Sequence, residues 1–457
     1  MLDPKHPEAG PTPSQTPKGH RHSKKYFAAD YGYFTEDGRE YVITRPDTPR
    51  PWVNVIANPD YGFVVSQNGS GFSWRRNSQL LRLNRWEQDL IRDEYGKYFY
   101  IRDIENGHVW SPTYKPCNTP LKHHQIAYGP GYARFSSIYH GIGHELKAFV
   151  SPSEPVEFWV LTVRNEGAHP RKLSLFGYFE WALGASSDTH REFHKTFIET
   201  TIDRKHNALF ALKRQPLVPI FVSEDLRDKP FEGFFALTNA DVANYDGDKE
   251  TFFGRYGAMH LPRAVAEGRL ENSEGKWKDA IAALQTDVEL APGQSKTLIF
   301  LIGMPDNKAH GYRLIRKYST LQAVEKVFEE QAQSWQNIED ACSVETPDLA
   351  MNFMTNTWLK YQAISGRVWG KTGYYQCSGA FGFRDQLQDS HIFLPIDSKM
   401  TRRQILLHAE QQFPDGTVHH WWHPNTKIAA VTDFSDDLRK TNGYSSHGPF
   451  VRMTGKF

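Results

Sequence analysis

Residues 156–163 read Val156-Glu157-Phe158-Trp159-Val160-Leu161-Thr162-Val163, a run that is mostly β-branched, aromatic or aliphatic. Such a run favours a strand packed inside a hydrophobic core. It ends at Asn165-Glu166-Gly167, which is a typical turn sequence. The following stretch, Lys172 to Trp181, alternates with period two and predicts a second strand with one apolar face, formed by Leu173, Leu175, Phe179 and Trp181.

The same strand pattern extends in both directions, from about Tyr26 to Met304. Asp287 to Leu290 and Thr297 to Ile302 flank the turn Ala291-Pro292-Gly293-Gln294, which predicts either a hairpin or a strand–turn–strand unit. Short strands punctuated by Gly, Asn and Pro are typical of a large antiparallel sandwich. We therefore expect a β domain over residues 26–310.

The hydrophobic period then changes to that of helices. Leu321, Val324, Phe328, Ala332 and Trp335 form one helical stripe. This stripe predicts a helical linker over residues 311–345, with 341–345 as a connector.

An all-α region is expected from residue 346 onwards. A helix is predicted to begin at Thr346-Pro347-Asp348, with Pro347 in its first turn. Another is predicted to begin at Thr401 as N-cap and to end before Pro414. The expected architecture is thus a β domain, a helical linker and a helical domain.

Composition narrows the function. The 457 residues suggest two or three domains, and 54 basic against 53 acidic residues leave a formal charge of +1. This balance disfavours nucleic-acid binding, which needs a basic excess. The 12 Trp residues fit either a ring-rich core or sugar stacking. The three cysteines lie far apart and fit neither a disulfide framework nor a zinc site.

The first 25 residues are rich in Pro, His and Lys and contain no apolar stretch. They predict a disordered leader rather than a signal peptide. Because no later segment is long and apolar enough to span a bilayer, we expect a cytoplasmic protein without a membrane partner.

The chemically richest run is Phe383-Arg384-Asp385-Gln386-Leu387-Gln388-Asp389-Ser390. Charges and amides beside aromatic rings are poor material for a core, because each buried polar group needs a partner. The same mixture suits a sugar, whose rim is hydroxyl and whose faces are C–H. The run therefore predicts a carbohydrate site.

Several segments together resemble a known family. They are Trp52-Val53-Asn54-Val55-Ile56, Tyr61 to Gly69, Phe72-Ser73-Trp74, Val109-Trp110-Ser111-Pro112, Gly379 to Asp389 and His420-Trp421-Trp422-His423-Pro424. In order along residues 26–438, they resemble glycoside hydrolase family 94, the inverting β-glucoside phosphorylases that include cellobiose, cellobionic acid and chitobiose phosphorylases. The resemblance implies an N-terminal antiparallel β-supersandwich, a helical linker and an (α/α)6 catalytic barrel, usually in a homodimer.

The resemblance also implies roles for individual residues. Arg384 and Asp385 would grip hydroxyls of the sugar at the cleaved bond, with a salt bridge at a helix start as the alternative. Arg367 would be a second sugar or phosphate contact, and Gln388 would support the site. Asp389 would cap or orient the helix or take part in binding. Trp421 would be a sugar platform or a packing residue.

Two other clusters have simpler readings. His419, His420 and His423 lack metal-ligand spacing on a helix, so we expect no metal there. The basic residues of the second cluster are either a phosphate contact or part of a solvated loop between strands; they are His190, Arg191, His194 and Lys195.

The resemblance implies phosphorolysis: a β-linked glucose disaccharide or oligosaccharide and inorganic phosphate give an α-sugar 1-phosphate and a free sugar, without a cofactor. The family's general acid is an Asp in an Asp-Trp-Asn-Asp-like segment, which this sequence lacks. We therefore expect the acid downstream of Phe457. Residues 439–457 are polar, turn-rich and unlike the family. The expectation is a C-terminally truncated chain with an incomplete barrel over 346–457, inactive alone.

Two alternatives remain open. One is a non-catalytic carbohydrate-binding fragment, or half of a split enzyme. The other is a module related to cyclic β-1,2-glucan synthases.

Overall fold

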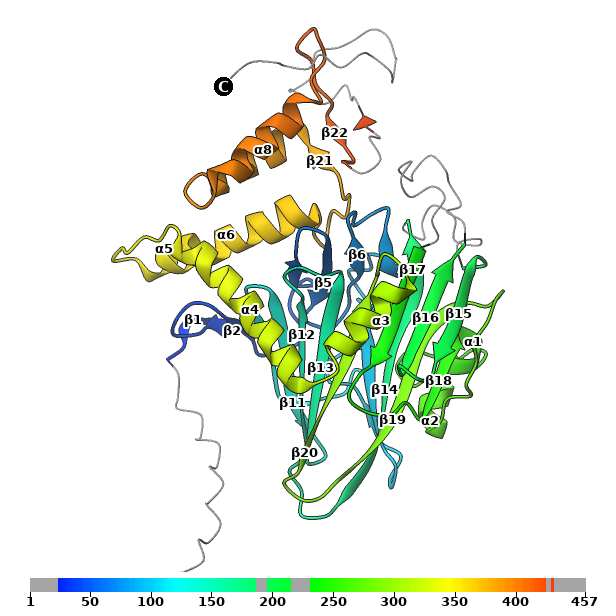
Figure 1. Ribbon diagram of the computed structural model, residues 1–457. Helices are drawn as coiled ribbons and strands as arrows, with labels where there is room; N and C mark the ends of the chain where they lie inside the picture. The colour runs from blue at the N-terminus through cyan, green and yellow to red at the C-terminus, as the bar shows by residue number, and fades with distance from the viewer. Residues whose placement is uncertain (1–23, 186–194, 215–230, 425–428, 431–457) are drawn as a thin grey trace, which may run out of the picture.

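Two antiparallel sheets packed face to face make up most of residues 26–303, and helices follow them (Figure 1). The computed structural model describes residues 24–185, 195–214, 231–424 and 429–430. The first sheet has eleven strands, in the order β1 (Tyr26–Ala29), β2 (Gly32–Phe34), β3 (Tyr41–Ile43), β10 (Lys122–Gly129), β11 (Tyr132–Tyr139), β12 (Ile142–Val150), β13 (Val156–Asn165), β20 (Ser295–Gly303), β17 (Phe231–Leu237), β16 (Ala208–Lys213) and β15 (Ile198–Asp203).

The second sheet has nine strands. Its main path is β18 (Asn244–Asp248), β19 (Ala280–Leu290), β14 (Arg171–Gly184), β7 (Arg82–Asn84), β6 (Ser73–Arg75), β5 (Tyr61–Ser66) and β4 (Val53–Ala57). Off this path, β8 (Tyr98–Asp103) pairs with β14 and with β9 (Val109–Trp110). The predicted antiparallel sandwich is confirmed.

The strand predicted at 156–163 is β13, near the middle of the eleven-stranded sheet. It pairs along its whole length with β12 on one side and β20 on the other, so that Trp159 faces Ala148 and Phe300 in register. Trp159 and Leu161 point into the core between the sheets, whereas Phe158 and Val160 point to the outer face. Both faces of this strand are buried, which explains its nearly continuous apolar sequence.

The strand predicted at 172–181 is β14, but it has two buried faces rather than one. Leu173, Leu175, Phe179 and Trp181 lie in the core between the sheets, as expected. Phe176 and Tyr178, on the opposite face, pack under two short helices, α1 (Lys249–Phe253) and α2 (Arg263–Glu267). The insertion between β18 and β19 thus covers the outer face of the second sheet.

The turn at Ala291–Gln294 joins two sheets rather than the arms of one hairpin. β19 pairs with β14 and β18, whereas β20 pairs with β13 and β17. The hairpin reading is therefore wrong and the strand–turn–strand reading is confirmed. Gly293 has φ 75°, a left-handed conformation that favours glycine in such a turn.

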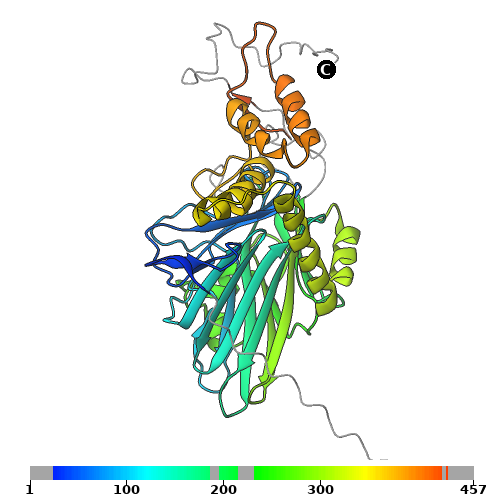
Figure 2. The same cartoon turned by 90° about the vertical axis from the view of Figure 1, so that its left-hand side faces the viewer.

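Helices α3 (Lys308–Lys317) and α4 (Leu321–Asp340) cover the outer face of the eleven-stranded sheet (Figure 2). Asn307 and Thr320 are their N-caps, accepting from the backbone N–H groups of His310 and Ala323. Leu314 and Val324 contact the same apolar cluster as Phe158. Of the predicted α4 stripe, Val324 and Trp335 are buried, Phe328 and Ala332 are partly buried, and Leu321 at the start of the helix is exposed.

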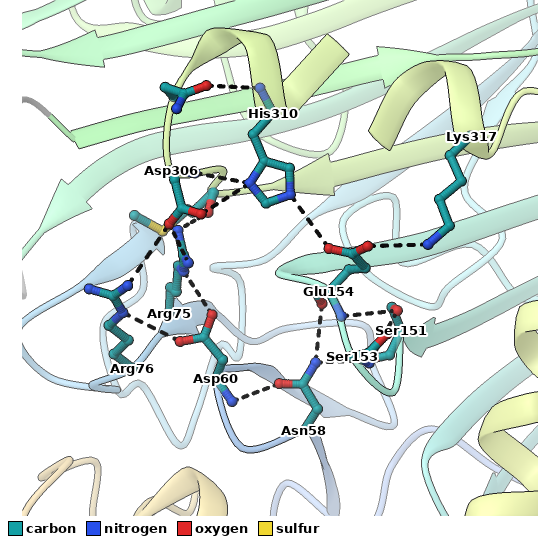
Figure 3. Close-up of polar contacts among 12 residues, drawn as sticks. Asn58, Asp60, Arg75, Arg76, Ser151, Ser153, Glu154, Asp306, His310 and Lys317 are labelled. Carbon is teal, nitrogen blue, oxygen red and sulfur yellow. Dashed lines mark hydrogen bonds and ion pairs between the residues drawn. The ribbon is translucent and has the colours of Figure 1, made fainter. Parts of the chain in front are cut away.

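A network of charges fixes α3 to the end of the sandwich (Figure 3). Arg75 Nε lies 2.9 Å from Asp60 Oδ2, and Arg75 Nη2 lies 2.7 Å from Asp306 Oδ1. His310 stands between Asp306 and Glu154, with its ring nitrogens 3.2 and 3.5 Å from their carboxylates. These contacts join a β-turn, a strand and a helix, so the linker and the sandwich are held in one arrangement.

The helical region lies beyond the end of the sandwich that carries β5 and β6 (Figures 1 and 2). Its first helix is continuous and contains wide π-type turns; its parts are α5 (Leu349–Phe353), η4 (Met354–Trp358), α6 (Leu359–Tyr361) and η5 (Gln362–Gly370). Then follow β21 (Phe381–Gly382), α7 (Phe383–Asp389), η6 (Ser390–Phe393), α8 (Ser398–Ala409), β22 (Trp421–Trp422) and β23 (Ala429–Ala430).

Two predicted helix starts are wrong by a few residues. Asp348 is the N-cap of α5, accepting from Ala350 and Met351, so Pro347 lies outside the helix. The N-cap of α8 is Asp397, and Thr401 lies inside the helix, where its hydroxyl donates to Ser390 O at 2.8 Å. Both caps are aspartates: Asp348 is the last residue of the predicted start, and Asp397 lies four residues before Thr401. Each accepts from free N–H groups in the first turn of its own helix.

None of the helices in the described part of the chain is long and apolar enough to cross a membrane. Residues 1–23 of the expected leader, His190, Arg191, His194 and residues 439–457 lie outside the described residues. The domain boundaries at 310 and 345, and the assignment of the helical region to a barrel, stay predictions.

Candidate functional site

The predicted polar run Phe383–Ser390 folds as α7 and the first residue of η6, directly after β21, and one of its own side chains, Gln386, accepts a hydrogen bond at the start of the helix. Gln386 is buried and its Oε1 accepts from the Gly382 N–H at 2.6 Å. The Phe383 N–H donates to His420 O at 3.1 Å. Because β21 pairs with β22, Phe381 faces Trp422 and Gly382 faces Trp421. The structure thus brings together the two motifs that the sequence singled out.

Arg384 and Asp385 lie side by side on the open face of α7. Their side chains are 55% and 56% exposed, and Arg384 Nε lies 3.8 Å from Asp385 Oδ1. Gln388, one turn after Arg384, is exposed on the same helix. These groups therefore present a guanidinium, a carboxylate and an amide to solvent rather than to the core.

Arg367 reaches the same helix from η5. Its Nε lies 2.8 Å from Asp389 Oδ2, and both side chains are partly exposed. Asp389 thus pairs with a cation and does not cap the helix; the next residue, Ser390, is the C-cap of α7. Since Asp385 and Asp389 are one turn apart, Arg367 extends the polar face formed by Arg384 and Asp385.

The two tryptophans of the paired strand differ. Trp422 is buried against His408, at 4.7 Å between ring centroids, and against Phe381 and Phe383. Trp421 is only half-buried, and its ring lies 5.4 Å from that of His423. Trp422 is therefore a packing residue, and Trp421 is the ring that remains accessible.

His423 is held as a neutral imidazole. The Asn77 Oδ1 accepts from the N–H groups of Gln79 and Leu80, which fixes the amide so that Nδ2 donates to His423 Nδ1 at 3.0 Å. Burial lowers the pKa of His423, and the charge of Lys371 lowers it further. No group of three or more His, Cys, Asp or Glu residues in the described ranges could hold a metal ion.

A buried lysine lies beneath this site. Lys371 has a left-handed backbone (φ 50°), and its Nζ donates to Trp369 O at 2.8 Å. The ammonium also stands 5.1 Å from the centroid of the Phe381 ring. Burial lowers the pKa of Lys371 to about 8. The sequence gives no sign of a role for this residue, because a lone Lys carries no motif.

The sandwich supports the loop that leads to α7. The Tyr374 hydroxyl donates to the buried carboxylate of Asp93 at 2.5 Å, and Gln88 Nε2 donates to Tyr374 O at 2.8 Å. Asn77 Nδ2 also donates to Gly379 O at 3.2 Å. These supports leave no signal in the local sequence, because they come from loops that lie hundreds of residues away along the chain.

Comparison with known proteins gives two family models. Residues 39–321 match the glycosyl hydrolase 94 supersandwich domain, and residues 334–449 match the catalytic domain of the glycosyl hydrolase 94 superfamily. Among solved structures, a putative kojibiose phosphorylase from human microbiome is similar with a TM-score of 0.52 and 9% identity, over 87% of this chain and 53% of that one. At that identity the similarity concerns the fold alone.

Several curated proteins are similar in sequence. N,N'-diacetylchitobiose phosphorylase of Vibrio furnissii is 29% identical over 86% of this chain and 48% of its own length. Solabiose phosphorylase of Paenibacillus borealis is 30% identical over 87% of this chain and 50% of its own length. The cyclic beta-(1,2)-glucan synthase NdvB of Rhizobium meliloti (strain 1021) is 35% identical over 89% of this chain and 14% of its own length. The chain thus spans about half the length of the phosphorylases and a smaller part of the synthase.

Proposed function

Because this chain belongs to glycosyl hydrolase family 94, we propose that it forms the sugar-holding part of an inverting β-glucoside phosphorylase. In this reaction a β-linked glucose disaccharide or oligosaccharide reacts with inorganic phosphate and gives an α-sugar 1-phosphate and a free sugar. The chain supplies the sandwich and the start of the helical region. Its partners are the sugar and phosphate, with neither a metal nor an organic cofactor, and it acts as a homodimer.

The observation that carries this proposal is the pair Arg384 and Asp385 on the open face of α7. A carboxylate accepts hydrogen bonds from two sugar hydroxyls, and a neighbouring guanidinium donates to hydroxyl or ring oxygens. Both side chains are more than half exposed. We assign to Arg384 and Asp385 the hydroxyls of the sugar at the cleaved bond.

Three further side chains complete the proposed cradle. Arg367 lies on the same side of α7 through its pair with Asp389, and there it donates to a sugar or phosphate oxygen. Gln388 supports Arg384 from one turn away. The half-buried ring of Trp421 offers a flat apolar face for the C–H face of a sugar.

Inverting phosphorolysis needs one proton donor, because phosphate itself attacks the anomeric carbon from the opposite side. Asp385 and Asp389 each lie beside a guanidinium on the partly open face of α7, an arrangement that suits a sugar whose hydroxyls donate hydrogen bonds to carboxylates. We therefore propose that neither is the general acid, and that the chain binds sugar without turning it over alone.

A second candidate function follows from the 35% identity with a cyclic β-(1,2)-glucan synthase. On this reading the chain is a module that handles β-1,2-linked glucan rather than a disaccharide phosphorylase. The proposed cradle is the same in both cases, and the linkage of the preferred ligand differs.

One experiment separates these readings. The purified chain is incubated with phosphate and with β-1,4-linked or β-1,2-linked glucose disaccharides, and glucose 1-phosphate is measured while binding is followed by calorimetry. We expect binding without product above background. Robust product would show that the acid lies within this chain, and exclusive binding of the β-1,2-linked sugar would favour the synthase module.

A further inference from the structure

A buried asparagine of the sandwich contacts both strands that support the proposed sugar cradle. Asn77 lies in the turn between β6 and β7 and is 2% exposed. Its Nδ2 donates to Gly379 O at 3.2 Å and to His423 Nδ1 at 3.0 Å. Gly379 lies two residues before β21, and His423 directly follows β22. One amide group therefore holds the approach to β21 and the end of β22 at the same point of the sandwich.

The sandwich itself sets the orientation of this amide. Asn77 Oδ1 accepts from the backbone N–H groups of Gln79 and Leu80, at 3.0 and 2.9 Å. The main chain of the turn is held as well, because the Leu81 N–H donates to Asn77 O at 3.0 Å. Since the side-chain oxygen is engaged within the turn, the two N–H groups of the amide are the ones directed at the helical region.

The conformation of Gly379 suits this contact. Its φ of 62° lies in the left-handed region that favours glycine. A Cβ at this position would clash with Asn77 Oδ1 and would lie 3.0 Å from Ser78 N. The Gly379 N–H donates to Lys371 O at 3.0 Å, at the end of the helix η5 that carries Arg367. Gly379 is thus bound on one side by the sandwich and on the other by η5.

The residues of the sugar cradle lie directly beyond these two contacts. From Gly379 the chain passes through β21 into α7, whose first turn carries Arg384 and Asp385. The strand β22, which pairs with β21, carries Trp421 and ends just before His423. A displacement of the chain at Asn77 would therefore reach both the charged pair and the tryptophan ring.

We propose that Asn77 is a positioning residue for the sugar cradle. Through Gly379 and His423 it fixes to the sandwich the two strands that carry α7 and Trp421. This inference rests on the proposed function, in which the side chains of α7 and Trp421 bind a β-linked glucose unit. Binding groups that are already held in place lose less conformational freedom when the ligand arrives, so a fixed cradle binds sugar more tightly.

The sandwich contains a second asparagine with the same set of hydrogen bonds. Asn58 is 5% exposed, and its Oδ1 accepts from the N–H groups of Asp60 and Tyr61 at 2.8 and 2.6 Å. Its Nδ2 donates to Ser151 O at 2.7 Å and to Glu154 O at 3.1 Å. All four partners belong to the sandwich, so Asn58→Ala removes bonds of the same kind without touching β21 or β22.

Two measurements on the full chain test the proposal: cellobiose binding by calorimetry, and backbone hydrogen exchange over residues 379–389. We expect Asn77→Ala to bind the sugar about three- to tenfold more weakly, because the cradle must then be ordered on binding. Exchange in this segment should become faster by about tenfold. Asn58→Ala should lower the thermal unfolding midpoint by a similar amount, yet leave the affinity and this exchange unchanged.

Two further variants sharpen the test. Asp385→Asn should weaken binding without changing the exchange, because Asp385 is assigned a direct contact with the sugar. Asn77→Asp keeps an oxygen for the turn but removes the Nδ2 donor, so it should show the same losses even where Asn77→Ala does not fold.

The outcomes separate this proposal from the proposed function. Full affinity in the Asn77 variants, or an equal loss of affinity in Asn58→Ala, overturns the positioning role. If the unmodified chain binds no sugar, the proposed function fails, and hydrogen exchange alone then decides on Asn77. Faster exchange over 379–389 in Asn77→Ala but not in Asn58→Ala supports its hold on the two strands, and unchanged exchange in Asn77→Ala overturns it.

Discussion

The hydroxyl of Tyr374 donates a hydrogen bond of 2.5 Å to the carboxylate of Asp93, although 281 residues separate the two in sequence. Asp93 belongs to the sandwich and is buried, and its other oxygen accepts from Ser66 Oγ at 2.7 Å. Tyr374 belongs to the loop that leads to α7. This bond therefore connects the sandwich to the segment that carries the proposed sugar-binding residues.

Tyr374→Phe removes this donor and leaves a buried carboxylate oxygen with one partner fewer. We expect the free energy of unfolding to fall by about 1–3 kcal/mol, measured by urea denaturation. Tyr375→Phe is the matched control, because its hydroxyl donates to Pro51 O at 3.1 Å from a half-exposed ring. Equal losses in the two variants would contradict the role given to Asp93.

A second prediction concerns a buried ion pair within the sandwich. Lys97 Nζ lies 2.9 Å from Glu157 Oε1, and the Ser73 hydroxyl donates to the same carboxylate. Lys97→Met leaves Glu157 buried and unpaired, so we expect a loss of about 3–5 kcal/mol in unfolding free energy. The double variant Lys97→Met/Glu157→Gln should recover part of that loss.

The control for this pair is Lys172→Met, which breaks the exposed contact with Glu289 and should leave stability unchanged. If the double variant were less stable than Lys97→Met, the unpaired Glu157 would not be the cause of the loss.

A third prediction concerns pH. Burial lowers the pKa of His124 to about 4 and that of His144 to about 3, from an ordinary value of 6.5, and His124 also lowers the pKa of His144. The unfolded chain takes up protons below pH 6.5, whereas the folded chain does not. The stability contribution is therefore complete above pH 6.5 and is lost as the pH falls towards 4.

Between pH 7 and pH 5, each of these histidines should cost about 2 kcal/mol of unfolding free energy. His124→Leu should flatten the decline measured by urea denaturation, because neither ring nitrogen of His124 has a partner among the described residues. His169→Gln, at an exposed position, should leave the profile unchanged. A profile for His124→Leu that parallels the original chain would refute this account.

The sequence predicted what depends on local pattern. The run at 156–163 revealed β13, and the stripe from Leu321 to Trp335 revealed α4, because period and burial agree in both. It did not reveal that β14 is buried on both faces, since the cover comes from α1 and α2 in an insertion. Nor did the turn at Ala291–Gln294 show that its strands enter different sheets.

In the candidate site, too, some features could be predicted from the sequence and others depend on tertiary contacts. The residue types of Arg384 and Asp385 predicted a polar site, and in the structure both side chains are exposed in the first turn of α7. The pairing of Arg367 with Asp389 required tertiary contact between η5 and α7. The sequence does not distinguish the two neighbouring tryptophans Trp421 and Trp422. The packing of Trp422 against His408 shows that Trp422 is the buried one.

Glucose and cellobiose binding to Asp385→Asn, followed by titration calorimetry, tests the sugar cradle most directly. Loss of the carboxylate charge should weaken binding at least tenfold, about 1.4 kcal/mol, because a charge-assisted hydrogen bond to a hydroxyl is lost. Stability should stay unchanged, since the side chain is exposed. Arg402→Gln, an exposed change on α8, should bind like the unmodified chain. Unaltered affinity in Asp385→Asn would contradict the assignment of α7 to the sugar.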